Sequence, residues 1–195
     1  IALLIMRDLH THVLCGRDDG CRDLEESREL ASTAKAAGHA GFVATPHIRR
    51  GMFDNTVDDI RRRRDETAET IRNTGLELFL GAEYFFDESL LIEGRKNALL
   101  TLGETSRYVL TEFPSTALPM RFADVLFELS LRGYIAVIAH PERCRGVQQD
   151  VDSALDAFSR ANALLQLALG SLAGRYGSDA QKMATRLVER GAYHV

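Results

Sequence analysis

The sequence predicts an α/β fold in which parallel strands alternate with helices and close into a barrel. Short apolar runs without clean polar alternation recur along the chain, which is typical of strands buried on both faces. Helical patterns lie between several of these runs, and such alternation favours parallel strands joined by right-handed crossovers. Five runs in succession end in an imidazole or a carboxylate. An open sheet gathers functional groups near one switch point, whereas a barrel brings every carboxyl end to one mouth, so the pattern favours a barrel.

The elements follow from these patterns in chain order. The predicted strands are residues 3–9, 41–45, 76–81, 108–113, 134–139, 164–169 and 192–195. The predicted helices, from their apolar stripes, are residues 23–37, 56–73, 122–132, 151–161 and 178–190. Thr56 and Asp59 have the spacing of a capping box, and Gly38, Gly75 and Gly191 stand where helices should stop. Residues 85–105 are predicted to hold a short helix or a loop.

The bulk composition describes an ordinary globular protein. The 195 residues suffice for one domain with a substantial core, so residues 1–195 are expected to form a single domain. The net charge of −4 excludes an overall basic field, and no nucleic-acid partner is expected. The basic run from Arg61 to Arg64 is flanked by acids and is interpreted as a solvated helix face.

Cysteine usage and hydropathy indicate the cellular setting. Three cysteines, Cys15, Cys21 and Cys144, form no disulfide framework, which indicates a reducing compartment and a cytoplasmic location. No apolar run approaches the roughly 20 residues of a membrane span, so no membrane insertion is expected. Two interpretations of the first five residues stay open: an upstream remnant before a start at Met6, or the first half of a buried strand.

The polar residues at the strand ends predict a metal site. They are His10, His12, His47, Glu83, Glu112 and His140. A lone histidine or glutamate at a strand end is usually an ordinary core or surface residue, but five coincidences favour metal binding. His10 and His12 alternate along a strand and therefore share one face. Imidazole and carboxylate together suit Mn, Fe, Zn or Co, and a carboxylate such as Glu83 can bridge two ions.

Two loops add candidate groups. Arg143 follows His140 and Pro141, and its planar donor fork suits the oxygens of a phosphoryl group. The competing interpretation is a surface arginine paired to a nearby acid. In the tight loop from Gly16 to Gly20, Asp19 could reach a metal, and Arg17 or Arg22 could contact an anionic ligand. An ordinary turn is the alternative for this loop.

A thiol mechanism can be excluded by counting. Cysteine-based tyrosine phosphatases need an arginine after five intervening residues, and the matching positions here hold Cys21, Ser27 and Asp150. None of these is an arginine, so the sequence does not encode that mechanism.

The motifs together resemble one family. In order they are D-L-H-T-H, D-D-G, A-T-P-H, G-x-E, E-F-P and H-P-E-R, and they run from about Asp8 to the end of the chain. This order resembles the PHP (polymerase and histidinol phosphatase) superfamily, and within it the bacterial PHP-type protein-tyrosine phosphatases of capsule and exopolysaccharide operons. The L-x-G-x-D-D-G and E-F-P motifs are specific to that branch, whereas the bare H-x-H is common to many hydrolases.

The resemblance implies a distorted seven-stranded (β/α) barrel with up to three divalent ions at its mouth, Mn first, with Fe, Zn, Co or Mg as alternatives. The implied metal ligands are His10, His12, Asp19, His47, Glu83, Glu112 and His140. Asp19 and Arg143 are the implied catalytic residues, and Arg143 and Arg17 the substrate-binding ones. The family usually has Pro where Cys15 stands. It also carries a D-x-H motif after its last strand, which should begin where this chain ends, at His194-Val195.

The expected activity is hydrolysis of phosphotyrosine in a protein, with the tail of a bacterial tyrosine kinase that regulates capsule or exopolysaccharide synthesis as the substrate. One alternative is a histidinol-phosphate-type or other small-molecule PHP phosphoesterase. A second alternative, of another class, is an inactive PHP module used for binding. Assembly into a homo-oligomer stays open.

Overall fold

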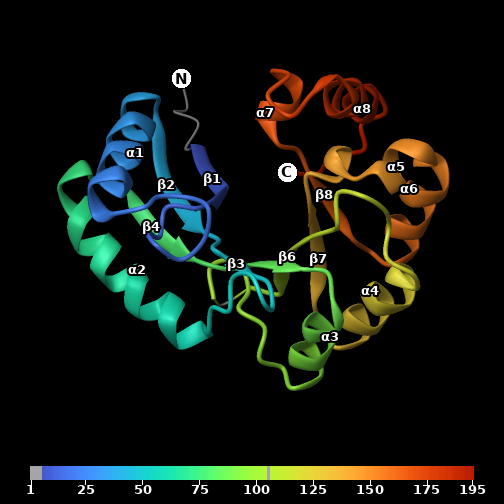
Figure 1. Ribbon diagram of the computed structural model, residues 1–195, viewed down its shortest axis with the longest axis horizontal. Coiled ribbons are helices and arrows are strands. Elements are labelled where there is room, and N and C mark those ends of the chain that lie inside the picture. The colour runs from blue at the N-terminus through green and yellow to red at the C-terminus, as the bar shows by residue number, and fades with distance from the viewer. Residues whose placement is uncertain (1–5, 105) are drawn as a thin grey trace. The chain divides into compact units, whose positions relative to one another are not determined.

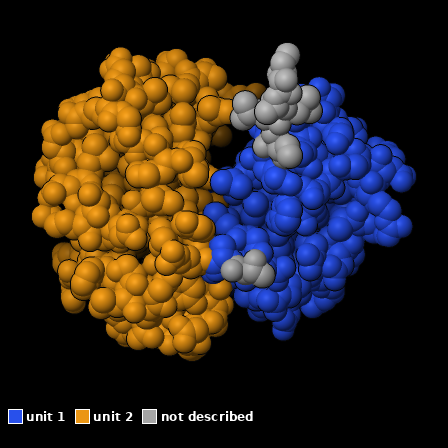
Figure 2. Space-filling model, turned by 180° about the vertical axis from the view of Figure 1, so that it is seen from behind, with its two compact units in different colours: residues 1–84, 100–106 blue, residues 85–99, 107–195 orange. Residues whose placement is uncertain are grey.

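The computed structural model describes residues 6–104 and 106–195. The chain divides into two compact units, which Figure 2 shows in different colours. The first unit contains the chain up to residue 84 together with residues 100–106, and the second contains residues 85–99 and 107–195.

The first unit is built on a three-stranded parallel sheet with the order β1-β2-β4 (Figure 1). These strands are Met6–Thr11, His39–Ala44 and Glu77–Leu80. Helices α1 (Leu24–Ala36) and α2 (Val57–Ile71) pack against each other beside this sheet. Asp23 and Thr56 cap the two helices by accepting the backbone N–H three residues on, as the capping pattern at Thr56 predicts.

Two very short strands in the first unit place candidate ligands side by side. They are β3 (His47–Ile48) and β5 (Glu83–Phe85), which pair in parallel with His47 opposite Glu83. A break separates each from the strand before it. Pro46, which has no N–H to donate, precedes β3, and Gly81 donates its own N–H to the carbonyl of Ala44.

The second unit contains a parallel sheet in which β7 (Ile135–Ala139) lies between β6 (Tyr108–Glu112) and β8 (Leu164–Gln166). Its helices are α3 (Glu88–Arg95), α4 (Phe122–Leu131), α5 (Arg145–Gln149), α6 (Val151–Arg160), α7 (Leu169–Leu172) and α8 (Ser178–Glu189). Short 3-10 helices cover Arg72–Thr74 in the first unit and Pro141–Arg143 in the second.

The core of the second unit contains a cluster of phenylalanines. Phe113 lies 4.9 Å from Phe86, 5.6 Å from Phe122 and 5.8 Å from Phe158, measured between ring centroids. Phe113 follows β6 directly, so this packing holds the strand end that carries Glu112. Aromatic pairs at such distances contribute on the order of 1 kcal/mol beyond the burial of their area.

The five predicted helices are confirmed as α1, α2, α4, α6 and α8, and the open segment at 85–105 contains α3. The strand predicted from residue 3 is seen from Met6 onward, and residues 1–5 lie outside the described residues together with both interpretations of them. The strand predicted at 192–195 is wrong. That segment is not a strand, although His194 donates its N–H to the carbonyl of Leu165 in β8.

The strand pairing does not confirm the expected closed barrel of seven strands. The described residues form eight strands, and the α/β class with parallel strands is confirmed. The strand count differs because β3 and β5 lie beyond the strands expected at 41–45 and 76–81, while the strand expected at 192–195 does not form.

No helix in the described part of the chain has the length and apolar character needed to cross a bilayer. The basic run on α2 forms exposed ion pairs, for example Arg62 with Asp59 at 3.1 Å and Arg61 with Glu104 at 3.2 Å. Such pairs contribute little to stability, as expected of a solvated face.

Candidate metal centre

The paired histidines lie at the end of β1 with both rings on one side of the strand. Thr11 between them faces the other way, is buried, and donates its hydroxyl to the carbonyl of Val43 at 2.8 Å. Asp8 accepts the backbone N–H of His10 at 3.0 Å. The period-two alternation of a strand therefore brings the Nε2 atoms of His10 and His12 to 3.2 Å of each other.

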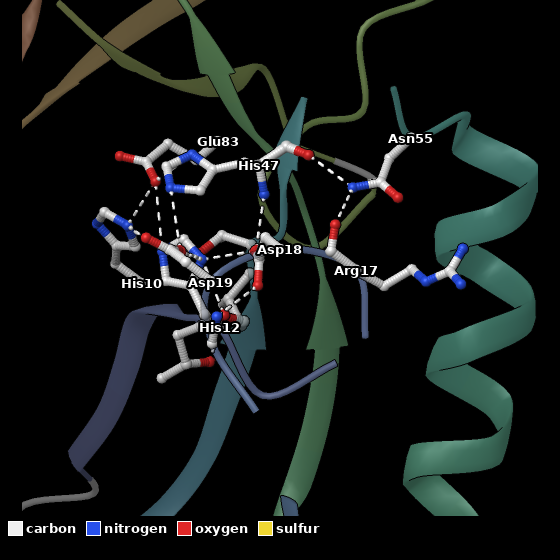
Figure 3. A network of polar contacts seen from close by, with 12 residues as sticks. His10, His12, Arg17, Asp18, Asp19, His47, Asn55 and Glu83 are labelled. Carbon is white, nitrogen blue, oxygen red and sulfur yellow. Dashed lines mark hydrogen bonds and ion pairs between the residues drawn. The ribbon is translucent and has the colours of Figure 1, made fainter. Parts of the chain in front are cut away.

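Glu83 is the centre of the cluster. Its side chain is fully buried, and its Oε2 atom lies 3.1 Å from His10 Nε2, 3.3 Å from His12 Nε2 and 3.2 Å from His47 Nδ1. Figure 3 shows these four side chains turned toward one another. Three imidazole nitrogens around one buried carboxylate oxygen form a compact set of donors of the type that divalent transition metals prefer.

His47 and Asp19 extend this set. Asp19 Oδ1 lies 3.6 Å from His47 Nε2 and 4.0 Å from His12 Nδ1, and its side chain is 71% exposed. The ring of His47 stacks on Phe53 at 5.3 Å, which fixes its plane. Burial lowers the pKa of His47 and so favours the neutral ring that can bind a metal.

The donor atoms fit a metal site in number and spacing. Within the first unit, His10, His12 and Glu83 form one group, and His12, Asp19 and His47 form a second. In each group the candidate ligand atoms lie within 4.8 Å of one another. A single ion bound at about 2.0–2.3 Å from each donor needs separations below that value, so both groups are compatible with bound ions.

Asp18 is a functional candidate that the sequence did not single out. Its fully buried carboxylate lies 2.7 Å from His12 Nδ1 and accepts the backbone N–H groups of Gly20 and His47, both at 2.9 Å. A carboxylate on the far nitrogen of a ligating imidazole fixes the tautomer and the ring orientation. Because Nδ1 of His12 is engaged by Asp18, Nε2 is left facing His10 and Glu83.

Gly20, which follows Asp18 and Asp19, packs closely against the end of β1. A Cβ on Gly20 would lie 2.2 Å from the carbonyl oxygen of His12, so only glycine allows the loop to approach the strand end. This close approach brings the carboxylate of Asp18 to 2.7 Å from Nδ1 of His12. The D-D-G sequence therefore brings Asp18 to the second imidazole, and the role of Asp19 as a metal ligand stays a prediction.

The charged groups of the cluster shift the pKa values of His12 and Asp18. Burial lowers the pKa of His12, but its hydrogen bonds to Asp18 and Glu83 and their negative charges outweigh burial and raise the pKa to about 10. For Asp18, burial raises the pKa, yet the contact with His12 and the two backbone donors leave it lowered. A metal ion binds only the deprotonated imidazole, so binding at His12 must displace this proton.

Replacing Asp18 with Asn is expected to weaken metal binding about 10- to 100-fold while leaving the fold intact, because the amide keeps the shape but loses the charge that orients His12. Titration of the metal-free protein with Mn²⁺ measures the change. Asp87→Asn is the matched control, since Asp87 also accepts a backbone N–H, at 2.7 Å from Ser89, but caps α3. Equal metal affinities in the two variants would contradict the role of Asp18.

The Arg17 side chain is not part of this cluster. Figure 3 shows it directed away from the histidines, toward α2. Its backbone carbonyl accepts a hydrogen bond from the Asn55 side chain at 2.7 Å, and the same amide group donates to the carbonyl of His47 at 2.8 Å. Asn55 therefore ties the loop to β3. A substrate-binding role for Arg17 stays a prediction.

The second unit contains the other three predicted site residues. Glu112 ends β6 and His140 follows β7, and the parallel register with Thr111 opposite Ile138 places both at the same edge of the sheet. His140 has a positive φ of 34° directly before Pro141 and the 3-10 turn. The 3-10 turn after β7 therefore connects His140 to Arg143.

Glu142 is a second residue that the sequence did not assign. It is fully buried and accepts hydrogen bonds from Ser171 Oγ at 2.7 Å, the Ala168 N–H at 3.2 Å and the Tyr193 hydroxyl at 2.9 Å. These donors come from α7, the residue before it, and the end of the chain. Glu142 therefore anchors the turn that holds His140 and Arg143.

The Arg143 guanidinium makes no hydrogen bond or ion pair with any described residue, in contrast to the exposed arginines of α2. The interpretation of Arg143 as a surface arginine paired to an acid is therefore wrong for the described chain. Its donors remain available to an anionic ligand.

The chain matches one family of known proteins. Residues 6–195 match the profile of the family described as "Capsular polysaccharide synthesis, CpsB/CapC". The chain is 35% identical to the tyrosine-protein phosphatase YwqE of Bacillus subtilis over 192 residues, which cover 97% of this chain and 74% of YwqE. It is 31% identical to the tyrosine-protein phosphatase CpsB of Streptococcus pneumoniae over 71% of this chain and 57% of CpsB.

A solved structure shows the same architecture. It comes from the crystal structures of YwqE from Bacillus subtilis and CpsB from Streptococcus pneumoniae, which are described as metal-dependent tyrosine phosphatases. The TM-score is 0.89 at 33% sequence identity, with 97% of this chain and 76% of the other covered. The resemblance to the PHP superfamily is consistent with these matches. Because the family profile matches nearly all of its length, the chain belongs to the CpsB/CapC family of capsular polysaccharide synthesis proteins.

Proposed function

We propose that this chain is a metal-dependent phosphatase that hydrolyses phosphotyrosine in proteins. The observation that carries the proposal is the buried Glu83 oxygen within 3.1–3.3 Å of three imidazole nitrogens. The family supplies the substrate class, since the relatives YwqE and CpsB are named tyrosine-protein phosphatases. The phosphorylated tail of a tyrosine kinase that controls capsule or exopolysaccharide synthesis is the partner that the family's name favours.

The proposed metal ligands are those expected from the sequence, which predicts a single phosphoesterase domain. They are His10, His12, Asp19, His47 and Glu83 of the first unit, and Glu112 and His140 of the second. Nitrogen and carboxylate donors of this kind suit Mn²⁺, with Fe, Zn, Co or Mg as alternatives and up to three ions in the site. When bound, the ions supply an activated water and positive charge that offsets the charge of the phosphoryl group.

The chain's own residues orient the reaction. Asp18 holds His12 and the backbone of His47, and so keeps two candidate ligands in place. Arg143 offers uncommitted N–H donors to the equatorial oxygens of the phosphoryl group, where charge gathers in the transition state. The leaving phenolate of tyrosine has a pKa near 10, so it needs little protonation from a general acid. No covalent intermediate with the enzyme is required.

The direct test is hydrolysis of matched phosphotyrosine and phosphoserine peptides with added Mn²⁺, followed by a chelator. We expect phosphotyrosine to be the preferred substrate, and EDTA to lower the rate more than about 100-fold, with recovery on adding Mn²⁺. Preference for small free phosphomonoesters would point to the small-molecule phosphoesterase instead. Metal binding without turnover of any phosphoester would support the inactive binding module.

The three thiols are expected to be dispensable. Cys15, Cys21 and Cys144 are buried, with 4%, 8% and 3% exposure. Burial raises the pKa of Cys21 and Cys144, which keeps both as unreactive thiols. We expect Cys15→Ser to retain kcat/KM within about 2-fold, as an uninvolved side chain should. A large loss of turnover at unchanged metal content would overturn the metal-based mechanism.

A further inference from the structure

The guanidinium of Arg143 rests on an aromatic ring. Its central carbon lies 4.3 Å from the centroid of Tyr176, in the loop between α7 and α8. Among the described residues this stack is the only side-chain interaction of Arg143 that the structure records. The Tyr176 side chain is itself partly open, with the residue 48% exposed, and its hydroxyl has no hydrogen-bond partner in the described chain.

The ring of Tyr176 is held closely by the backbone of α7. A Cβ on Gly170 would lie 2.9 Å from Cε2 of Tyr176, so the ring lies directly against Gly170 and a side chain there would displace it. The N–H of Arg175 donates to the carbonyl of Gly170 at 2.9 Å and closes the loop over the helix. Gly174 and Gly177 have φ values of 77° and 92°, which turn the chain on both sides of Tyr176.

The arginine and its aromatic support belong to one tied piece of structure. Glu142, which precedes Arg143, accepts hydrogen bonds from the Ala168 N–H and from Ser171 Oγ. Those two donors lie at the start of α7 and within it, on either side of Gly170. The turn after β7 and the loop that carries Tyr176 are therefore connected through a fully buried carboxylate.

Stacking occupies the face of a guanidinium and leaves its N–H groups free, because these groups lie in the plane at the edge. We infer that Tyr176 is a positioning residue for Arg143, which holds the guanidinium by its face so that its edge can bind two phosphoryl oxygens. This inference rests on the proposed role of Arg143 in phosphate recognition. An ion pair with a carboxylate could also restrain an arginine, but it would consume the donors that the phosphoryl group needs.

The test compares side chains at position 176. Tyr176→Phe keeps the ring and is expected to retain kcat/KM for a phosphotyrosine peptide within about 2-fold. Tyr176→Ala and Tyr176→Leu remove the ring and are expected to lower it about 10-fold, the usual strength of such a contact. Gly170→Ala, which displaces the ring without removing it, should lower it in the same direction. Phe127→Ala is the matched control, since Phe127 is an exposed aromatic on α4 with 52% exposure.

Two further measurements separate positioning from other roles. In an Arg143→Ala background, Tyr176→Ala is expected to change kcat/KM by less than about 2-fold, because its effect passes through the arginine. Binding of inorganic phosphate to the Mn²⁺-loaded protein should weaken about 10-fold in Tyr176→Ala and remain unchanged in Tyr176→Phe.

The outcomes distinguish this inference from the proposed function. Equal phosphate affinity in the Ala and Phe variants would overturn the positioning role, even if the wild type hydrolyses phosphotyrosine normally. If Tyr176→Ala lowers kcat/KM about 10-fold in the Arg143→Ala background as well, the positioning role is also overturned. If the wild type hydrolyses no phosphotyrosine peptide, the proposed substrate is wrong, whereas the phosphate-binding comparison still decides the role of Tyr176.

Discussion

Replacing Glu83 with Gln is expected to lower kcat/KM for a phosphotyrosine peptide on the order of 10³-fold or more, together with the metal content. Glu83 Oε2 lies 3.1–3.3 Å from ring nitrogens of His10, His12 and His47. The amide has nearly the same size but carries no charge. The change therefore removes the negative centre around which the imidazoles gather, and with it the affinity for divalent cations.

Metal analysis and thermal unfolding make this result specific. The variant should keep its secondary structure, since Gln occupies the same volume, while its Mn²⁺ content falls. Glu77→Gln is the matched control, because Glu77 lies on β4, the strand that precedes β5 in the chain, but forms an exposed pair with Arg7. We expect the control to retain activity within about 2-fold, as surface substitutions usually do. Wild-type metal content in Glu83→Gln would remove Glu83 from the ligand set.

Replacing Arg143 with Ala is expected to lower kcat/KM on the order of 10²–10³, which corresponds to about 3–4 kcal/mol of transition-state stabilisation. The guanidinium has no carboxylate partner among the described residues, so its removal breaks no ion pair and leaves no acid unpaired. The loss should therefore fall on catalysis rather than on folding. Arg143→Lys should recover only part of it, because an ammonium cannot present a planar fork.

An exposed arginine of the same unit serves as the control. Arg160 pairs with Asp156 at 2.8 Å on α6, and its replacement by Ala should cost less than about 1 kcal/mol in stability and nothing in turnover. Metal content must be equal in all variants, so that only the contact with phosphate differs. Near wild-type kinetics of Arg143→Ala would end the phosphate role and, with it, the reason for the Tyr176 support.

Secondary structure was largely predictable because it depends on local patterns. The helices at α1 and α2 follow from their apolar stripes and from caps such as Thr56, whose partner Asp59 is only three residues away. The short strands β3 and β5 were not predicted, because His47–Ile48 and Glu83–Phe85 are too short to give a periodic pattern of their own. Closure of a barrel is likewise a property of long-range pairing, which strand count alone cannot specify.

The candidate ligands could be found from the sequence because carboxyl ends of parallel strands share one edge, and His10, His12, His47 and Glu83 lie at or shortly after the carboxyl ends of β1, β2 and β4. Their common contact on one oxygen depends on the tertiary pairing of β3 with β5, since His47 and Glu83 are far apart in the chain. The same holds for the supporting groups. From the sequence Asp18 is an ordinary turn residue, and only the packing of Gly20 against the carbonyl of His12 shows its contact with that ring.

The sequence by itself determined the α/β class, the helices, the histidine–carboxylate set and the family, because these depend on short motifs and on local periodicity. Only the tertiary structure decided how the strands divide between sheets, that Asp18 orients His12, and that Arg143 lies on Tyr176 with its donors free. Those features are contacts between residues distant in the chain or across a folded loop. Their geometry is set by packing and burial, which no local pattern records.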